Sequence, residues 1–192
     1  MMNYDPEVIK TVSAAVEFPL ERFVNSYHLP DCARVNEALI QAIRDEGGTN
    51  SHLSNVKGYM TKWRLELSHD DEPYDQFFTF LNKSFYNSLA CYMNKGGRPT
   101  NGDLLYAIDT IWGAIYENGD WCDSHVHPPG QLSWCYYLQV PENSPPLEFD
   151  DIGYKFYPEV GDLVIFPGWM NHSVAEFKGQ GERIVLAGNM RF

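Results

Sequence analysis

The second half of the chain, from about residue 104, is divided into short β-branched and aromatic stretches separated by Gly, Pro and Asn. Eight such stretches follow one another: 104–117, 121–127, 131–140, 147–149, 153–157, 162–167, 172–177 and 182–190. Short strands with frequent turn residues are typical of antiparallel β-structure and leave no room for crossover helices. The pattern therefore predicts an antiparallel sandwich or a small barrel for this half.

Two helices are predicted in the first half. One begins after Pro30-Asp31-Cys32, with Asp31 as a possible N-cap, and ends at Gly47-Gly48. Its apolar residues Val35, Leu39 and Ile43 recur at helical spacing. The second is expected from about Glu72 to Met93, because its aromatic and apolar residues lie three and four positions apart.

The remaining segments of the first half are expected to be short and irregular. Residues 8–24 suggest short strands or an extended lead-in, and residues 49–66 suggest a loop followed by a short ordered piece. The 192 residues fit a single domain, 1–192. Within it we expect a helical and extended support region over about 1–100, packed on one face of a β-core over about 104–192.

The composition restricts the partners of the protein. A net charge of −12 and no visible Lys/Arg cluster disfavour nucleic acid and anionic membranes, and favour a neutral or basic substrate. The four cysteines, with no CxxC spacing, predict free thiols in a reducing compartment. No long apolar segment and no signal peptide are visible, so we expect a cytoplasmic protein.

Three histidines form the candidate metal site. His125 and His127 are separated by one residue, so on a strand both imidazoles would lie on one face. His172 comes after the apolar stretch 162–167. Imidazole is a common ligand of iron, zinc and copper. Asp123 is a rival ligand, because it precedes His125 by two residues and would share its face on a strand.

Several motifs in this order resemble the 2-oxoglutarate/Fe(II)-dependent dioxygenases, most closely a bacterial and phage branch with an H-x-H-P signature. The motifs are Ser54-Asn-Val-Lys-Gly58-Tyr, Trp112 with Gly119, His125-Val-His127-Pro, Ser133-Trp-Cys-Tyr-Tyr137-Leu, Gly161-Asp-Leu-Val-Ile-Phe-Pro167, His172-Ser-Val and Arg183-Ile-Val-Leu-Ala-Gly-Asn189. A looser similarity links the chain to prolyl 4-hydroxylases, because Tyr116, Gly119 and His125 keep the spacing found in those enzymes.

The resemblance implies a mainly β fold with N-terminal helices, the cupin-like double-stranded β-helix or jelly roll. It implies Fe(II) bound by His125, His127 and His172, with no catalytic residue beyond these ligands. It also implies 2-oxoglutarate as cosubstrate, its far carboxylate held by Arg183 and Tyr116. The expected reaction consumes O₂, forms succinate and CO₂, and hydroxylates a peptide, a protein side chain or a small molecule.

Three positions depart from the family pattern. His127 stands where the wider superfamily has a carboxylate ligand, Trp134 stands where the branch has Gly, and Val185 replaces a frequent hydroxyl residue. The first departure keeps a rival open, a three-histidine cupin-type iron dioxygenase that does not use 2-oxoglutarate. A non-catalytic jelly-roll binding protein is the second rival. Succinate formation from 2-oxoglutarate distinguishes the three hypotheses.

Overall fold

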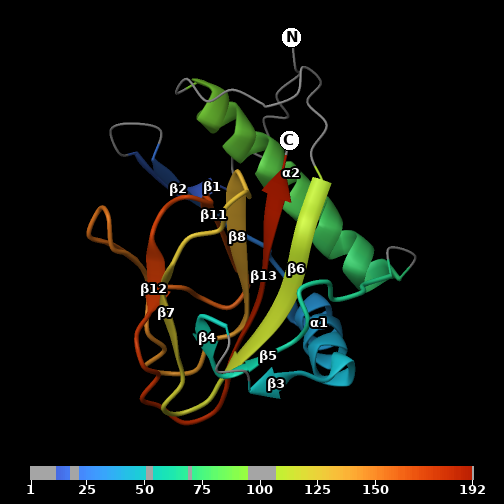
Figure 1. The fold of residues 1–192 in the computed structure, drawn as a ribbon. Coiled ribbons are helices and arrows are strands. Elements are labelled where there is room, and N and C mark those ends of the chain that lie inside the picture. The colour runs from blue at the N-terminus through green and yellow to red at the C-terminus, as the bar shows by residue number, and fades with distance from the viewer. Residues whose placement is uncertain (1–11, 18–21, 51–53, 69–70, 95–106, 192) are drawn as a thin grey trace.

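The computed structural model describes residues 12–17, 22–50, 54–68, 71–94 and 107–191, and folds them into two antiparallel sheets and two helices (Figure 1). The larger sheet has the strand order β1-β2-β11-β8-β13-β6-β5-β3 and the smaller one β10-β9-β12-β7-β4. The strands are β1 (Val12–Glu17), β2 (Phe23–His28), β3 (Thr49–Asn50), β4 (Val56–Lys57), β5 (Tyr59–Met60), β6 (Ala107–Tyr116), β7 (Trp121–His125), β8 (Leu132–Gln139), β9 (Leu147–Phe149), β10 (Tyr154–Phe156), β11 (Asp162–Pro167), β12 (His172–Val174) and β13 (Arg183–Arg191).

All eight strands predicted in the second half are confirmed, and their arrangement is the expected jelly roll. The short strands expected over residues 8–24 are confirmed by β1 and by β2, which begins at Phe23. Both precede the first helix, and β2 extends the larger sheet by pairing with β11. Three further short strands lie within residues 49–66, and β5 pairs with β6 on the other side of the same sheet.

Helices α1 (Ala33–Glu46) and α2 (Glu72–Asn94) confirm both helix predictions and pack on one face of the larger sheet (Figure 1). The predicted cap of α1 is wrong. Cys32 occupies the N-cap position, its side chain makes no capping hydrogen bond, and Asp31 has a left-handed backbone with φ of 52°. Asp31 therefore forms the turn that enters the helix rather than its cap.

Two hydrophobic cores result from these layers. One lies between the helices and the larger sheet and includes Leu39, Ile43, Phe77 and Trp134. The other lies between the two sheets and contains the candidate site. Trp134 faces the helices, where it fills the space over Gly188: a Cβ on that glycine would come within 2.5 Å of the indole. The unusual Trp134 is thus accommodated by a glycine on the neighbouring strand.

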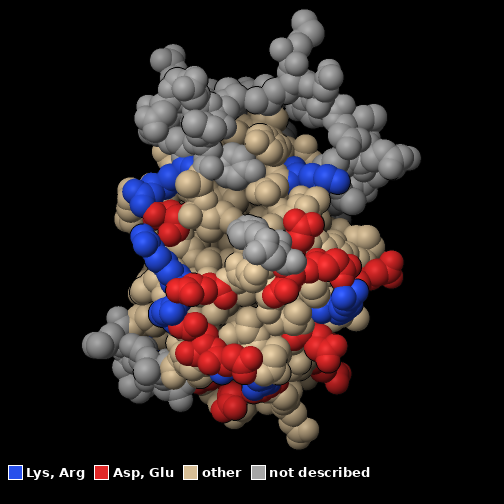
Figure 2. Space-filling model, turned by 90° about the vertical axis from the view of Figure 1, so that its right-hand side faces the viewer, with Lys and Arg blue, Asp and Glu red and all other residues tan. Residues whose placement is uncertain are grey.

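The molecular surface reflects the negative net charge. In Figure 2, Asp and Glu side chains gather over the lower half of the face on which α1 and β3 lie, with few Lys or Arg among them. No helix within the described residues is long and apolar enough to cross a membrane.

Close packing of α1 on β6 gives a test of the fold. Ile43 is fully buried, and a Cβ at Gly113 would lie 2.3–2.8 Å from three of its side-chain atoms. We expect Gly113→Ala to lower the free energy of unfolding by about 1–3 kcal/mol, because the overpacked atoms must move. Adding Ile43→Ala should make the double mutant less destabilised than the sum of the single changes, by about 0.5–3 kcal/mol in urea denaturation.

The control pair is Gly113→Ala with Val35→Ala. Val35 is also a buried residue of α1, but it is not among the atoms nearest to Gly113. These two changes should be additive within about 0.5 kcal/mol. Additivity of the Gly113 and Ile43 changes would contradict the packing described here.

Candidate metal centre

The first part of the site is a β-bulge between β7 and β12. His172 pairs with His125, and Val174 pairs with Cys122, so β7 has one more residue than β12 between the two pairs. The extra residue lets both Cys122 and His125 line the interior, although they are three positions apart. Asp123 is turned outward, where its carboxylate accepts from the Trp121 indole N–H at 2.9 Å and pairs with Lys57 at 3.2 Å.

Two expectations about this segment are therefore wrong. Asp123 does not share the face of His125, and the cluster of possible metal ligands does not include it. His127 is not on the strand, because β7 ends at His125. The backbone N–H of His127 instead donates to the carbonyl of Gly168 at 2.7 Å, and this contact holds the segment against the turn that precedes β12.

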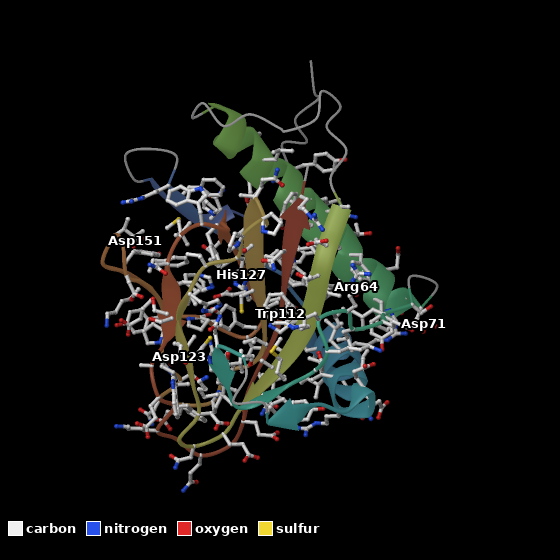
Figure 3. The ribbon with its side chains drawn as sticks, in the orientation of Figure 1. Arg64, Asp71, Trp112, Asp123, His127 and Asp151 are labelled. Carbon is white, nitrogen blue, oxygen red and sulfur yellow. The ribbon has the colours of Figure 1, made fainter. Side chains whose placement is uncertain are left out.

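The three histidines nevertheless converge, with His127 lying near Trp112 in the interior (Figure 3). One nitrogen from each of His125, His127 and His172 lies within 4.8 Å of the others. The Nε2 atoms of His127 and His172 are 3.2 Å apart. Two imidazole nitrogens bound at right angles to a metal at ~2.1 Å would be ~3.0 Å apart, so the observed spacing fits neighbouring ligands of one ion.

Backbone carbonyls fix the tautomers of two of these rings. Nδ1 of His125 lies 2.7 Å from the carbonyl oxygen of Asp123, and Nδ1 of His172 lies 2.9 Å from that of Met170. A carbonyl oxygen only accepts, so both Nδ1 atoms carry the proton and both Nε2 atoms keep a lone pair. This is the arrangement in which a protein orients a metal-binding histidine.

The same rings are held in the neutral form. Burial, together with the neighbouring His172 and His125, lowers the pKa of His127 to about 3. Burial also lowers the pKa of His172 to about 3, with His125 as the next cause. The pKa of His125 is lowered by burial too, although its bond to the Asp123 carbonyl opposes this. Neutral imidazole is the form that binds metals.

Arg183 is the second part of the site. It opens β13, where it pairs with Tyr116 on β6. Although Arg183 follows His172 closely in the sequence, no hairpin joins them, because β12 and β13 belong to different sheets. The guanidinium instead lies across the interior from β12, 5.0 Å from the centre of the Tyr116 ring and 5.3 Å from that of Tyr137.

The guanidinium of Arg183 has unused hydrogen-bonding capacity. The residue is 1% exposed, and its Nε and Nη1 have no hydrogen-bond partner among the described residues. Arginine remains a cation in proteins, and a buried cation without a counter-ion is costly. The side chain is therefore placed to receive an anion with at least two acceptor atoms.

Two tyrosines accompany this cation, and sequence reasoning identified only Tyr116. Tyr137 is fully buried, and its hydroxyl has no partner among the described residues. Burial raises the pKa of both phenols well above the usual value, so both remain O–H donors. Burial likewise raises the pKa of the nearby Cys122 to about 12 and that of Cys135 to about 11. Arg183 therefore has no anionic side chain beside it in this group.

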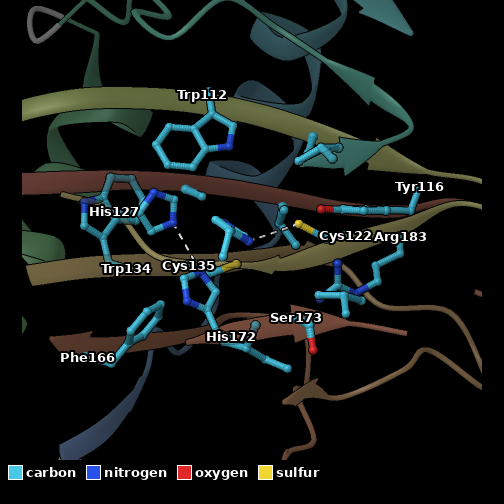
Figure 4. A pocket seen from close by; sticks show the side chains of 17 residues that line it. Trp112, Tyr116, Cys122, His127, Trp134, Cys135, Phe166, His172, Ser173 and Arg183 are labelled. Carbon is cyan, nitrogen blue, oxygen red and sulfur yellow. Dashed lines mark hydrogen bonds between the residues drawn. The ribbon is translucent and has the colours of Figure 1, made fainter. Parts of the chain in front are cut away.

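The histidines and Arg183 line one cavity between the sheets. In Figure 4, the rings of His127 and His172 lie toward one end and Tyr116 and Arg183 at the other. Small side chains separate the two ends, namely Ala114, Cys135 and Val185. The cavity measures about 60 Å³ for water-sized spheres, which is room for roughly four to six waters and suits a small molecule.

Metal binding is the first test of the site. After loading with Fe(II) under nitrogen and gel filtration, we expect about one iron per wild-type chain, and much less in His125→Ala, His127→Ala and His172→Ala, because each removes one ligand. Elemental analysis measures the ratio. His28→Ala and Asp123→Asn are the controls and should keep the wild-type iron content. Unchanged iron in His172→Ala would refute the three-histidine assignment.

The lowered histidine pKa values give a second test, on the metal-free protein. Between pH 6.5 and 5 the unfolded chain binds protons at His127 and His172 that the folded chain does not, so stability falls as the pH falls. Each histidine contributes up to about 1.4 kcal/mol per pH unit. The stability difference between wild type and His172→Asn, measured by urea denaturation, should therefore shrink from pH 7 to pH 5. A pH-independent difference would contradict the neutral buried imidazole.

The comparisons with known proteins agree with this geometry. Residues 152–189 match a family model described as "Putative 2OG-Fe(II) oxygenase", and this stretch contains His172 and Arg183. A search of curated proteins finds no match.

Solved structures share the fold. The viral collagen prolyl hydroxylase of Paramecium bursaria Chlorella virus-1, in its 2-oxoglutarate complex, matches with a TM-score of 0.62 and 16% identity over 87% of this chain and 94% of its own. A prolyl-4-hydroxylase of Pseudomonas putida gives 0.59 and 20% over 88% and 91%. An oxidoreductase of the 2OG-Fe(II) oxygenase family from Burkholderia pseudomallei gives 0.55 and 14% over 86% and 84%.

The solved structures and the family model support different parts of the resemblance seen in the sequence. At such low identity the structural similarity shows the jelly-roll fold, whereas the family model covers the stretch that carries the last histidine and the arginine. Together they agree with the resemblance seen in the motifs: residues 152–189 match a 2OG-Fe(II) oxygenase model, and the chain has the fold of the prolyl hydroxylases and the 2OG-Fe(II) oxygenase named above.

Proposed function

We propose that this protein is a 2-oxoglutarate- and Fe(II)-dependent dioxygenase that hydroxylates a primary substrate. One observation carries the proposal. A cavity with three converging neutral histidines toward one end has, at the other, a buried arginine whose guanidinium lacks partners. The histidines suit a divalent metal, and the arginine suits the far carboxylate of a short diacid.

The metal ligands would be His125, His127 and His172, with Nε2 of His125 and His172 available because their Nδ1 atoms are engaged. Iron bound there supplies the activation of O₂. In the overall reaction the substrate C–H becomes C–OH, while 2-oxoglutarate and O₂ are converted to succinate and CO₂. One oxygen atom enters the substrate and the other enters succinate, so the reaction is balanced.

The chain's own contribution at the buried end is to bind and orient the cosubstrate. The planar guanidinium of Arg183 can donate two parallel hydrogen bonds to a carboxylate. The phenol of Tyr116 stays protonated and lies beside it, so it can donate a further bond. Val185 occupies the position of the family's usual hydroxyl residue and cannot donate, which leaves this task to the tyrosines.

The middle of the cavity is mostly apolar. Ala114, Val185 and Leu147 contribute apolar surface to its lining. A low local dielectric strengthens the attraction between Arg183 and a carboxylate. The same environment holds the imidazoles in the neutral form that binds metal.

The two rival hypotheses do not explain the end of the cavity at which Arg183 lies. A three-histidine iron dioxygenase without 2-oxoglutarate explains His127 but gives no use for an unpartnered buried cation. A non-catalytic binding protein has no need for three neutral imidazoles with neighbouring ligand atoms. The unused donors of Arg183 therefore favour the 2-oxoglutarate reaction over both.

The primary substrate is proposed from charge and from similar proteins. With a net charge of −12, the protein is suited to a neutral or basic substrate and not to nucleic acid. Two of the similar structures are prolyl hydroxylases, one of them a collagen prolyl hydroxylase. A peptide or protein side chain is therefore our preferred substrate class.

We also propose a cytoplasmic location, because the three described cysteines are all free thiols.

Binding of 2-oxoglutarate tests the proposal. We expect Arg183→Ala to raise the Kd for 2-oxoglutarate by about ten- to a hundred-fold, because a charge-assisted hydrogen bond contributes roughly 1.5–3 kcal/mol. Its iron content should stay near that of wild type. Tyr116→Phe should have a smaller effect of the same sign. Calorimetric titration of the Mn(II)-loaded protein under nitrogen measures both values.

Arg191→Ala is the control, since Arg191 lies at the other end of β13, half-exposed and paired with Asp109. It should bind 2-oxoglutarate like wild type, and circular dichroism should show that the Arg183 variant keeps the fold. If wild type does not bind 2-oxoglutarate at millimolar concentration, the proposal fails and the three-histidine alternative replaces it.

A further inference from the structure

Trp63 is a half-exposed tryptophan held in a fixed position beside the candidate site. The exposed fraction of Trp63 is 48%. The segment around it runs along β6, where Ile111 N–H donates to the Trp63 carbonyl at 3.1 Å and Leu65 N–H donates to the Ile111 carbonyl at 2.9 Å. On the other side of Trp63, Thr61 N–H donates to the Gly113 carbonyl at 3.0 Å, so the backbone is anchored on both sides although much of the indole faces solvent.

The indole of Trp63 continues an aromatic surface that leads to the histidines. The Trp63 and Trp112 rings meet edge to face at 4.8 Å between centroids, and Trp112 lies 5.6 Å from the ring of His127. Trp112 lines the cavity that contains the three histidines, and it is seen beside His127 in Figure 4. The Trp63–Trp112 and Trp112–His127 distances together match the length of about three residues of an extended chain, at ~3.3–3.6 Å per residue.

A row of polar side chains lies next to this surface, one pair of residues beyond Trp112 on the same face of the sheet. Ser133 Oγ donates to Asn189 Oδ1 at 2.7 Å, and Asn189 Nδ2 donates to Thr110 Oγ1 at 2.9 Å. The Thr110 hydroxyl proton has no acceptor among the described residues. Because both hydrogen bonds of the row point toward Thr110, the Thr110 hydroxyl is left as a free donor. It lies two residues from Trp112, about 7 Å along β6.

These side chains share a chemical character that selects a ligand. Trp63, Trp112, Thr110 and Asn189 are all uncharged, and together they offer flat apolar surface beside a hydrogen-bond donor. A peptide unit matches both features, because its plane packs on aromatic rings and its carbonyl accepts a hydrogen bond.

Trp63 also borders a second hollow, lined by Gly47, Gly48, Thr61 and Lys62 among others. An extended chain can reach from this hollow across Trp63 to the metal centre, whereas a small molecule cannot.

We propose that Trp63 and Thr110, with Trp112, form the subsite that binds an extended, uncharged peptide segment of the primary substrate next to the metal. The inference rests on the proposed function and names the residues that would bind its preferred substrate class. Trp63 and Thr110 are specificity-determining residues in this scheme: they bind the substrate and do not contact the cosubstrate at Arg183.

The test uses N-acetylated, C-amidated pentapeptides with Gly and Ala flanks and each of the common amino acids at the centre. Wild type with Fe(II), 2-oxoglutarate and O₂ is assayed for peptides that gain one oxygen atom by mass spectrometry, with succinate measured in parallel. For the best peptide, Trp63→Ala should raise KM about ten-fold with kcat changed less than about two-fold, since it removes binding equally from ground and transition states.

Two further variants resolve the contributions. Trp63→Phe keeps an aromatic ring and should recover part of the lost affinity. Thr110→Val keeps the shape but removes the donor, so KM should rise by about two- to ten-fold. The matched control is Trp121→Ala, which removes a tryptophan of similar exposure, 40%, from the outer face of β7. Its KM should stay within about two-fold of wild type.

The Kd for 2-oxoglutarate, measured on each Mn(II)-loaded variant, separates the subsite from the cosubstrate site and should be unchanged. An unchanged peptide KM in Trp63→Ala would overturn the subsite. So would a wild type that binds 2-oxoglutarate and forms succinate but oxidises no peptide, and in that case the proposed function stands. Failure of wild type to bind 2-oxoglutarate overturns the proposed function itself, and the subsite with it.

Discussion

The register of β13 between β6 and β8 is the constraint on which the site depends. Because side chains alternate, every second residue of β13 faces the interior between the sheets. Its neighbours on β6 and β8 are fixed by the same ladder, and together they form four successive rows across the sheet. From the buried end outward these rows are Arg183 with Tyr116, Val185 with Ala114 and Tyr137, Ala187 with Trp112 and Cys135, and Asn189 with Thr110 and Ser133. A slip of one residue would turn Arg183 toward the helices and remove the cation from the cavity.

The rows divide the work of the site along one axis. The first holds the cation, the second is small and apolar, the third lies beneath the histidine cluster, and the fourth is polar and uncharged. The smaller sheet supplies only two of the histidines, through the pairing of His172 with His125, and the loop after β7 supplies His127. In the proposed scheme the larger sheet would therefore set the distance between the cosubstrate and substrate groups, while the smaller sheet would supply two of the three metal ligands.

Much of this arrangement could be predicted from the sequence, and the exceptions have physical reasons. The strands of the second half were readable because turn residues separate β-branched and aromatic runs. The bulge in β7 was not, since an extra residue changes which side chains face inward without changing composition, and so Asp123 was wrongly placed beside His125. The role of Tyr137 was equally hidden. Tyr136 and Tyr137 are adjacent and point to opposite faces of the sheet. Only the register shows that the Tyr136 hydroxyl donates to Asn36 of helix α1 while Tyr137 faces Arg183.

The replacement of the family's carboxylate ligand by His127 changes the charge of the proposed site. Three neutral imidazoles leave the full charge of a divalent ion uncompensated, whereas a carboxylate ligand would cancel one unit of it. Arg183 adds a further positive charge at the other end, and the described residues lining the cavity include no Asp or Glu. A dianion such as 2-oxoglutarate would neutralise Arg183 with one carboxylate and would lower the charge at the metal end from +2 to +1 with the other. The loss of the carboxylate makes the site more dependent on its cosubstrate for charge balance, and the outward turn of Asp123 preserves that dependence by keeping the nearest carboxylate of β7 on the other face of the strand.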